Sequence, residues 1–351
     1  MVDEVYQRLR KFLDALPGGF PESESGVELR ILRKLFSPEE AEMELHMRPA
    51  PEPPEAIAVR AGMDEGEAAT LLESMAKQGL IYRIRFDENV LYMAIQFVVG
   101  IYEFHLNTMD RELAEMFEEY LPNLEKIVNA TETKQHRVVP VGASIEETTA
   151  VATYESVSDL VENQELIAVA PCICRKEQGL LDNPCKRPHE VCFTFGMAAE
   201  YYIENGLGRE VSVDEAKEIL VAAEEAALVL APTNAREILN LCCCCKCCCG
   251  VLRVLGKMER PADIVQSSFQ ARIDPDACNS CGECYVRCQI DAIVEGERTL
   301  EVDEARCIGC GLCVTTCPED AIEMVRLPDV PEPPANIVEM NMRIAQEQSK
   351  L

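Results

Sequence analysis

Hydrophobic positions in the first third of the chain recur at the spacing of amphipathic helices, and then alternate as they do in strands. Residues 27–35, 54–61 and 64–78 are each predicted to be helical, and the last of these segments stops before Gly79. Residues 80–86 and 90–95 flank the turn 87–89 and predict a β-hairpin. A capping box of Ser37 and Glu40 predicts one more helix start between the first two segments.

Helices followed by a hairpin are the element order of a winged helix, so we predict a winged-helix-like domain over residues 1–106. Residues 110–128 carry apolar side chains at helical spacing and contain Pro122. This pattern predicts a long amphipathic helix with a kink at the proline, within a helical connector over 107–136.

The middle of the chain alternates strand and helix signals. The apolar run 166–170 predicts a buried strand, Ser212 and Glu215 form a capping box for a helix that ends near 226, and 228–231 predict a second strand. We therefore predict an α/β domain over 137–262. A proline-rich acidic linker and a loosely attached tail helix are expected over 327–351.

Acidic residues outnumber basic ones, 62 to 33, which gives a formal net charge of −29. A surface of this sign repels nucleic acid. The helix over 64–78 has Asp64, Glu65, Glu67 and Glu73 against Lys77 alone. We therefore expect the winged-helix-like domain to contact proteins, and we expect redox partner proteins with a basic docking face and no nucleic acid.

The longest apolar stretch, over 92–101, is too short to cross a bilayer, and the first twenty residues lack the apolar core of a secretory signal. We expect a cytoplasmic protein without a membrane span. Thiols stay reduced in that compartment, so clustered cysteines indicate metal centres there. The 19 cysteines also favour an anaerobic host.

Eight cysteines form two copies of one spacing. The first copy is C-x2-C-x2-C-x3-C over 278–288, and the second repeats it over 307–317; Asp-Ala-Ile follows both, at 291–293 and 320–322. Gly282 and Gly311 within the copies allow the backbone to approach a cluster closely. The pattern predicts iron–sulfur ligands, with a zinc site or a disulfide knot as the alternative.

These motifs resemble the bacterial-type ferredoxin domain with two [4Fe–4S] clusters, over residues 270–326. The resemblance implies a βαββαβ fold, electron transfer and crossed ligation, in which the fourth cysteine of each copy binds the other copy's cluster. It departs at Gln289, where the family has proline. The implied ligand sets are Cys278, Cys281, Cys284 and Cys317 for one cluster, and Cys307, Cys310, Cys313 and Cys288 for the other.

Eleven further cysteines lie in two segments that we expect to meet in space. They are Cys172, Cys174, Cys185 and Cys192 in the first segment, and Cys242, Cys243, Cys244, Cys245, Cys247, Cys248 and Cys249 in the second. Adjacent thiolates repel one another unless a metal neutralises them, so we predict accessory metal ligands. Together with the ferredoxin motifs, the PCxCR and CCCCxCCC patterns resemble a family of uncharacterised 4Fe–4S-binding proteins of anaerobes.

Three occupants remain open for these cysteines. One or two additional [4Fe–4S] clusters are the leading interpretation, and a zinc or copper(I) thiolate site is the second. A noncubane cluster is the third, because Cys248-Cys249-Gly250 resembles part of the cysteine-rich modules of heterodisulfide reductases. Cations near these segments would favour the reduced state of a cluster or hold an anionic substrate. The basic residues there are Arg175, Lys176, Lys186, Arg187, His189, Lys246 and Arg253.

The predicted fold is α+β and multidomain. The chain has no glycine-rich nucleotide loop and no CxxCH haem motif, and its catalytic residues stay unknown. The leading hypothesis is an electron-transfer protein, or the electron-relay subunit of an anaerobic oxidoreductase. The alternatives are a reductase with a catalytic iron–sulfur centre in the cysteine-rich region, and a redox-sensing regulator.

Overall fold

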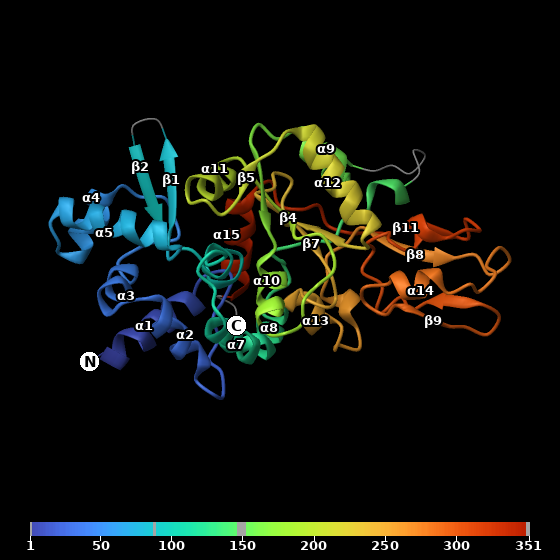
Figure 1. The fold of residues 1–351 in the computed structure, drawn as a ribbon, viewed down its shortest axis with the longest axis horizontal. Helices are drawn as coiled ribbons and strands as arrows, with labels where there is room; N and C mark the ends of the chain where they lie inside the picture. Colours follow the sequence, from blue (N-terminus) through green and yellow to red (C-terminus); the bar gives the residue numbers. More distant parts are fainter. Residues whose placement is uncertain (1, 87–88, 146–151, 349–351) are drawn as a thin grey trace. The chain divides into compact units, whose positions relative to one another are not determined.

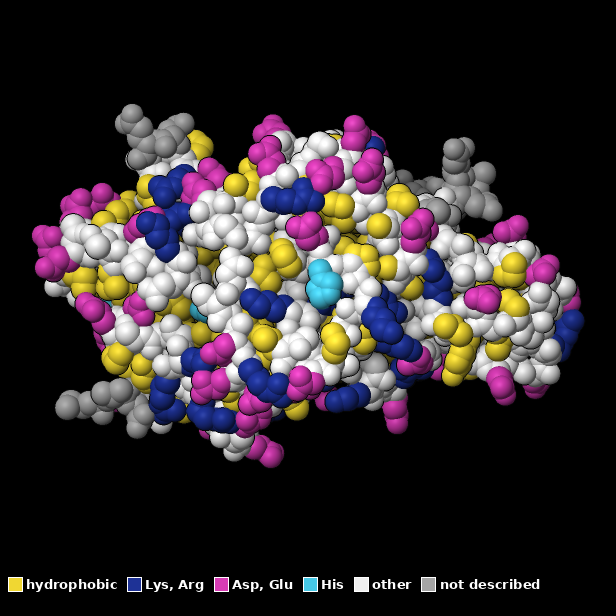
Figure 2. All heavy atoms as spheres, in the orientation of Figure 1, with side chains coloured by type: hydrophobic (Ala, Val, Ile, Leu, Met, Phe, Trp, Pro, Cys, Tyr) yellow, Lys and Arg dark blue, Asp and Glu magenta, His cyan; other side chains and the backbone are white. Residues whose placement is uncertain are grey.

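The computed structural model describes residues 2–86, 89–145 and 152–348. The chain divides into two compact units. The first comprises residues 1–130 with 176–184 and 201–207, and the second comprises 131–175, 185–200 and 208–351. On the face shown in Figure 2, acidic side chains are scattered and interspersed with Lys and Arg, in keeping with the net charge of −29.

The first unit is mostly helical and carries one hairpin (Figure 1). Its helices are α1 (Val2–Asp14), α2 (Val27–Leu35), α3 (Pro38–Glu44), α4 (Pro54–Ala61), α5 (Glu65–Gln78), α6 (Tyr102–Phe104), α7 (Arg111–Tyr120) and α8 (Leu124–Asn129). The hairpin pairs β1 (Tyr82–Phe86) with β2 (Asn89–Met93), and its register places Phe86 opposite Asn89. Residues 87 and 88 of the predicted turn lie outside the described residues.

The helix starts and ends of the first unit lie where the capping residues and Pro122 predict them. The Ser37 side chain accepts from Glu40 N, and the Glu40 side chain accepts from Ser37 N, which closes the capping box of α3. Asp64 caps α5, and Gly79 ends that helix in the left-handed region at φ 82°. The long helix predicted over 110–128 is interrupted by a 3-10 turn at Leu121–Asn123, because Pro122 cannot continue the hydrogen-bond ladder.

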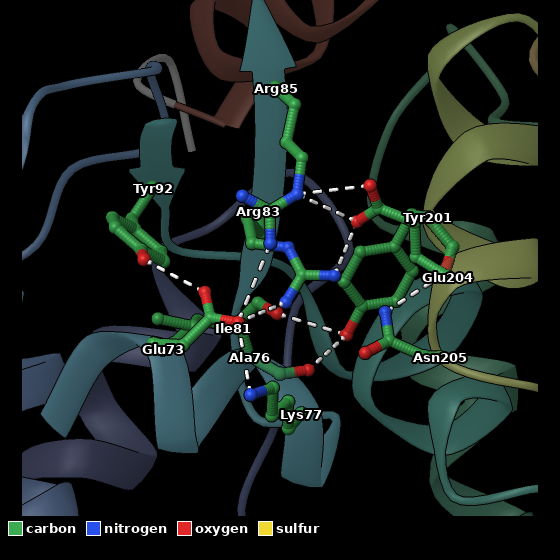
Figure 3. A network of polar contacts seen from close by, with 10 residues as sticks. All are labelled: Glu73, Ala76, Lys77, Ile81, Arg83, Arg85, Tyr92, Tyr201, Glu204 and Asn205. Atoms are coloured by element: carbon green, nitrogen blue, oxygen red, sulfur yellow. Dashed lines mark hydrogen bonds and ion pairs between the residues drawn. The ribbon is translucent and has the colours of Figure 1, made fainter. Parts of the chain in front are cut away.

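A network of ion pairs ties the hairpin to α5 in the first unit (Figure 3). Arg83, whose side chain is 2% exposed, contacts Glu73 at 2.8 Å and Glu204 at 2.5 Å. Arg85 contacts Glu204 at 2.9 Å, and Tyr92 Oη donates to Glu73 at 3.0 Å. Burial works against ionisation of Glu73, but the hydrogen bond from Tyr92 and the charge of Arg83 leave its pKa lowered. The arginines of the hairpin are thus neutralised within the unit.

The second unit is built on a five-stranded sheet in the order β5-β3-β4-β7-β6. Its strands are β3 (Ile167–Pro171), β4 (Glu190–Phe195), β5 (Arg209–Glu210), β6 (Val229–Pro232) and β7 (Asn240–Cys244). Every pairing is antiparallel, so this part is of the α+β type and the α/β class predicted for it is wrong. Its core includes Phe193 and Phe195, which are fully buried and stack at 6.5 Å.

Helices lie before, between and after these strands in the chain. They are α9 (Val157–Glu162), α10 (Ile173–Leu180), α11 (Met197–Glu204), α12 (Val213–Glu225) and α13 (Gly250–Leu255). Ser212 caps α12 by accepting from Glu215 N, as its capping signal predicts. α12 packs on β3, β4 and α9.

The remaining strands form two antiparallel pairs, β8 (Phe269–Ile273) with β11 (Ile322–Arg326), and β9 (Ile293–Glu295) with β10 (Leu300–Val302). The short helix α14 (Glu283–Arg287) follows the first cysteine loop. The second helix of the predicted βαββαβ order is only a 3-10 turn, Val314–Thr316. The order observed is therefore strand, helix, two strands, 3-10 turn, strand.

The C-terminal helix α15 (Ile337–Gln348) is packed into the second unit. Met340 and Ile344 are buried, and Glu347 accepts hydrogen bonds from Thr133 N and Oγ1 at 2.9 and 2.6 Å. The expectation of a loosely attached tail is therefore wrong. Within the described residues, no helix combines the length and the hydrophobicity that crossing a membrane requires.

Candidate iron–sulfur centres

The two cysteine loops of the ferredoxin-like part share one local geometry. Ala292 N donates to Cys288 Sγ at 3.2 Å, and Ala321 N donates to Cys317 Sγ at 3.3 Å. The Asp before each alanine is left-handed, at φ 55° for Asp291 and 49° for Asp320. The repeated Asp-Ala-Ile sequence therefore forms a turn that aims a backbone N–H at the fourth cysteine of each copy, and such hydrogen bonds tune the potential of a cluster.

The first predicted ligand set lines a single pocket. Its thiols are those of Cys278, Cys281, Cys284 and Cys317, and the rest of the lining combines apolar side chains of β8, β10 and β11 with polar residues of the two cysteine loops. Gly282, at φ 84°, begins α14 between Cys281 and Cys284, so the loop turns where a residue with a side chain would be strained. The fourth cysteine of the second copy thus lies with the first three of the first copy.

The second predicted ligand set is more deeply buried. Burial, together with the charges of Cys288 and Cys307, raises the pKa of Cys310 to about 12. Burial and the charge of Cys310 raise the pKa of Cys313 well above its usual value. Cys288 and Cys307 pack against the cores of both the five-stranded sheet and the ferredoxin-like part. Four thiols that repel one another as anions, one buried and three partly buried, are a donor set that suits a metal centre, which displaces their protons.

The cysteines of strand β7 lie on two opposite faces of the sheet. In a strand, successive side chains point to opposite faces. Cys243 is 3% exposed in the apolar core, whereas Cys242 and Cys244 face the other way, toward further thiols. Cys242 lies opposite Cys192 in the register of β4 and β7, so the two cysteine segments meet as predicted.

Six of the eleven accessory thiols form one connected group, which we call the six-thiol group. Its hydrogen-bonded neighbours run in the order Cys172, Cys174, Cys249, Cys244, Cys242 and Cys192. Hydrogen bonds from adjacent thiols hold the pKa values of Cys242 and Cys249 well below their usual range. The same bonds hold the pKa values of Cys174 and Cys244 well above it. His136 also contacts Cys242 and was not predicted as a site residue.

Four other thiols form a second, tighter group, which we call the four-thiol group. It consists of Cys185, Cys245, Cys247 and Cys248, whose sulfur atoms all lie within 4.8 Å of one another. Hydrogen bonding to Cys248 and the charge of Arg175 lower the pKa of Cys245 to about 5. Cys243 belongs to neither group, so the structure separates the eleven cysteines into six, four and one.

Arg175 is buried beside both groups, at 1% exposure. Its Nη2 donates to Cys243 O at 3.0 Å and reaches Cys245 Sγ at 3.7 Å, and its charge also acts on Cys172. Burial alone would lower the pKa of Arg175, but the thiolate charges of Cys172 and Cys245 raise it on balance. Among the described residues, Nε and Nη1 of Arg175 have no hydrogen-bond partner.

Only some of the other basic residues predicted here reach sulfur. Arg187 Nη1 donates to Cys247 Sγ at 3.3 Å. Lys246 pairs with Asp291 at 2.6 Å, and Lys176 donates to the carbonyl of Leu106. His189 is exposed, and its Nε2 lies 3.3 Å from the carbonyl oxygen of Cys185.

Comparison with known proteins identifies one part of the chain. Residues 271–324 match the family model of the 4Fe-4S dicluster domain. No curated protein and no solved structure matches the chain. The ferredoxin-like part is therefore similar to an iron–sulfur dicluster domain, and the matched range contains both copies of the cysteine spacing.

Proposed function

We propose that the protein is an iron–sulfur electron-transfer protein that relays electrons between its dicluster domain and an accessory centre in the cysteine-rich region. The observation that carries this proposal is the placement of the buried ligand set. Cys288, Cys307 and Cys310 pack against the core that contains Cys249, and Cys172, Cys174 and Cys244 of the six-thiol group pack against the same core. A cluster on that set adjoins the accessory thiols, as successive centres of a relay must.

The other ligand set offers an entry point for electrons. Cys281 is exposed, and the adjacent helix α14 presents Tyr285 and Val286 to solvent at 58% and 78% exposure. Exposed apolar side chains next to a cluster suit brief docking of a redox partner. Because the chain is strongly acidic, we propose that this partner presents a basic face.

The six-thiol group is proposed as the accessory iron–sulfur centre. It offers more thiols than one [4Fe–4S] cluster needs, and its strand and loop residues lie in a chain of mutual contacts. Arg175 supplies a buried cation next to it, which stabilises negative charge on a bound cluster. The four cysteines that ligate this cluster are part of the proposal.

The first unit is proposed to dock a protein partner through a winged-helix-like domain. Its helix order and hairpin support this class. DNA binding is disfavoured because Arg83 and Arg85 are paired with Glu73 and Glu204, so the hairpin has no free arginine to place on a phosphate.

The relay is tested with Cys310→Ala in the full-length protein, purified anaerobically, with Cys243→Ala as the matched control. Cys310 lies in the buried ligand set, whereas Cys243 lies in neither thiol group. Electrons from substoichiometric dithionite should reach the accessory centre rapidly in the control and much more slowly in Cys310→Ala, as measured by freeze-quench EPR. An unchanged rate of electron transfer to the accessory centre in Cys310→Ala would contradict the proposed relay.

A further inference from the structure

The four-thiol group has the geometry of a site for one metal ion. The Sγ–Sγ distances are 4.0 Å between Cys185 and Cys245, 3.8 Å between Cys185 and Cys247, 3.4 Å between Cys245 and Cys247, and 3.7 Å between Cys247 and Cys248. We propose that Cys185, Cys245, Cys247 and Cys248 bind a single zinc ion, separate from the iron–sulfur clusters of the relay.

The distances between the sulfur atoms distinguish a site for one metal ion from a site for a [4Fe–4S] cluster. Four thiolates at the corners of a tetrahedron, each about 2.3 Å from zinc, are about 3.8 Å apart. The four Sγ–Sγ distances given above scatter around that value. The thiolates of a cubane bind four different irons, so the body of the cluster pushes them farther apart than thiolates that share one ion.

The backbone supplies three of the four ligands from one tight turn. β7 ends at Cys244, and the N–H groups of Cys248 and Cys249 both donate to Cys245 O, at 3.3 and 3.0 Å. This turn gathers Cys245, Cys247 and Cys248 on one side. The fourth ligand, Cys185, comes from the loop that follows α10, so the ion joins two segments that are distant in sequence.

Two arginines match the charge of a zinc tetrathiolate. Four thiolates around a divalent ion leave a net charge of about −2, which is costly to bury without compensation. Arg175 Nη2 lies 3.7 Å from Cys245 Sγ, and Arg187 Nη1 lies 3.3 Å from Cys247 Sγ. Arg187 is fixed in turn by donating from Nε to Ala226 O at 2.9 Å.

Zinc is favoured over ferrous iron because the same thiolate site binds zinc more tightly in the general order of divalent affinities. All four coordination positions are filled by protein sulfur, which is typical of a structural site. The ion would therefore fix the turn that contains Lys246 and would not exchange electrons. This inference is independent of the proposed relay.

The test counts zinc, iron and acid-labile sulfide in the full-length protein after anaerobic purification and passage through a desalting column with a moderate chelator. We expect about one zinc per chain in the wild type and in Cys243→Ala, and a loss of about tenfold or more in Cys185→Ala. Iron and sulfide should be the same in all three proteins. Cys243 is the matched control because it lies in the same cysteine run but outside the four-thiol group.

X-ray absorption at the zinc edge of the wild type keeps the test independent of variant folding. The expected spectrum shows four sulfur neighbours at about 2.3 Å and no metal neighbour. Zinc absent from the wild type, zinc retained by Cys185→Ala, or iron and sulfide that fall with the Cys185→Ala change would each overturn the proposal. Failure of the relay would appear instead in the electron-transfer rate of Cys310→Ala.

Discussion

The side chain of Gln289 accepts a hydrogen bond at Oε1 from the backbone N–H of Lys246, at 3.1 Å. Gln289 directly follows the last cysteine of the first ferredoxin copy, and Lys246 lies between Cys245 and Cys247 of the accessory run. The same side chain is 2% exposed and donates from Nε2 to Arg287 O at 3.0 Å. The residue that replaces the family's proline therefore links the dicluster domain to the cysteine-rich region.

Replacing Gln289 with alanine should loosen this link. The N–H of Lys246 would lose a partly buried hydrogen bond, which costs about 0.5–1.5 kcal/mol of unfolding free energy. We expect faster amide exchange at residues 245–248 and slower electron transfer to the accessory centre. Gln270→Ala is the control, because Gln270 donates to Glu304 O within the dicluster domain; equal exchange in both variants would show that Gln289 has no such role.

Replacing Arg175 with methionine should make the accessory centre harder to reduce. The change removes a buried cation whose charge acts on Cys172, so the midpoint potential should move to a more negative value. Lys186→Met, at an exposed position nearby in sequence, provides the comparison in a redox titration followed by EPR. A midpoint that stays the same in Arg175→Met would place the centre away from this arginine.

Replacing Arg83 with methionine should destabilise the first unit. Glu73 and Glu204 would keep only the partly exposed Arg85 as a shared cation, and we expect a loss of about 2–4 kcal/mol, near the lower end for breaking a buried ion pair. Arg85→Met is the control, because its side chain is 37% exposed and should contribute under about 1 kcal/mol. Urea unfolding measured by tyrosine fluorescence distinguishes the two; equal losses would contradict the role of burial.

Glu44 in α3 should make the first unit less stable as pH rises. Both of its carboxyl oxygens are buried, and neither has a hydrogen-bond partner among the described residues. Burial raises the pKa of Glu44 well above 4.5 in the folded protein. Above pH 4.5 the unfolded chain loses this proton while the folded protein keeps it, so the free energy of unfolding falls with rising pH until the folded pKa is passed.

The Glu44→Gln variant should therefore unfold with a flatter pH dependence than the wild type as the pH rises above 4.5. Glu42→Gln changes an exposed residue of the same helix and should keep the wild-type slope. The measurement is urea unfolding followed by tyrosine fluorescence, since seven of the nine tyrosines belong to the first unit. A Glu44→Gln slope equal to that of the wild type would contradict the account of Glu44.

The sequence predicts features that depend on neighbouring residues. Ser37, Asp64 and Gly79 act within one helical turn of their own positions, so their capping roles follow from residue type and spacing. The family match over 271–324 likewise follows from a spacing repeated within short loops.

The meeting of the two cysteine segments was predicted, but several other features that depend on distant contacts were not. Cys245, Cys247 and Cys248 separate from the six-thiol group because β7 ends at Cys244 and the next residues form a turn, whereas Cys249 after the turn contacts Cys244 again. A run of identical residues does not signal this change. The contact of His136 with Cys242 and the bond of Gln289 to Lys246 join residues far apart in the chain. Only the folded sheet brings such pairs together.

The most direct test of the relay counts iron and acid-labile sulfide per chain in anaerobically purified protein. Two clusters in the dicluster domain and one on the six-thiol group predict about twelve of each, with one zinc in addition. Changing Cys242 and Cys249 together to alanine should reduce both counts to about eight and leave the zinc in place. A wild-type value of about eight or less would contradict a relay that extends beyond the dicluster domain.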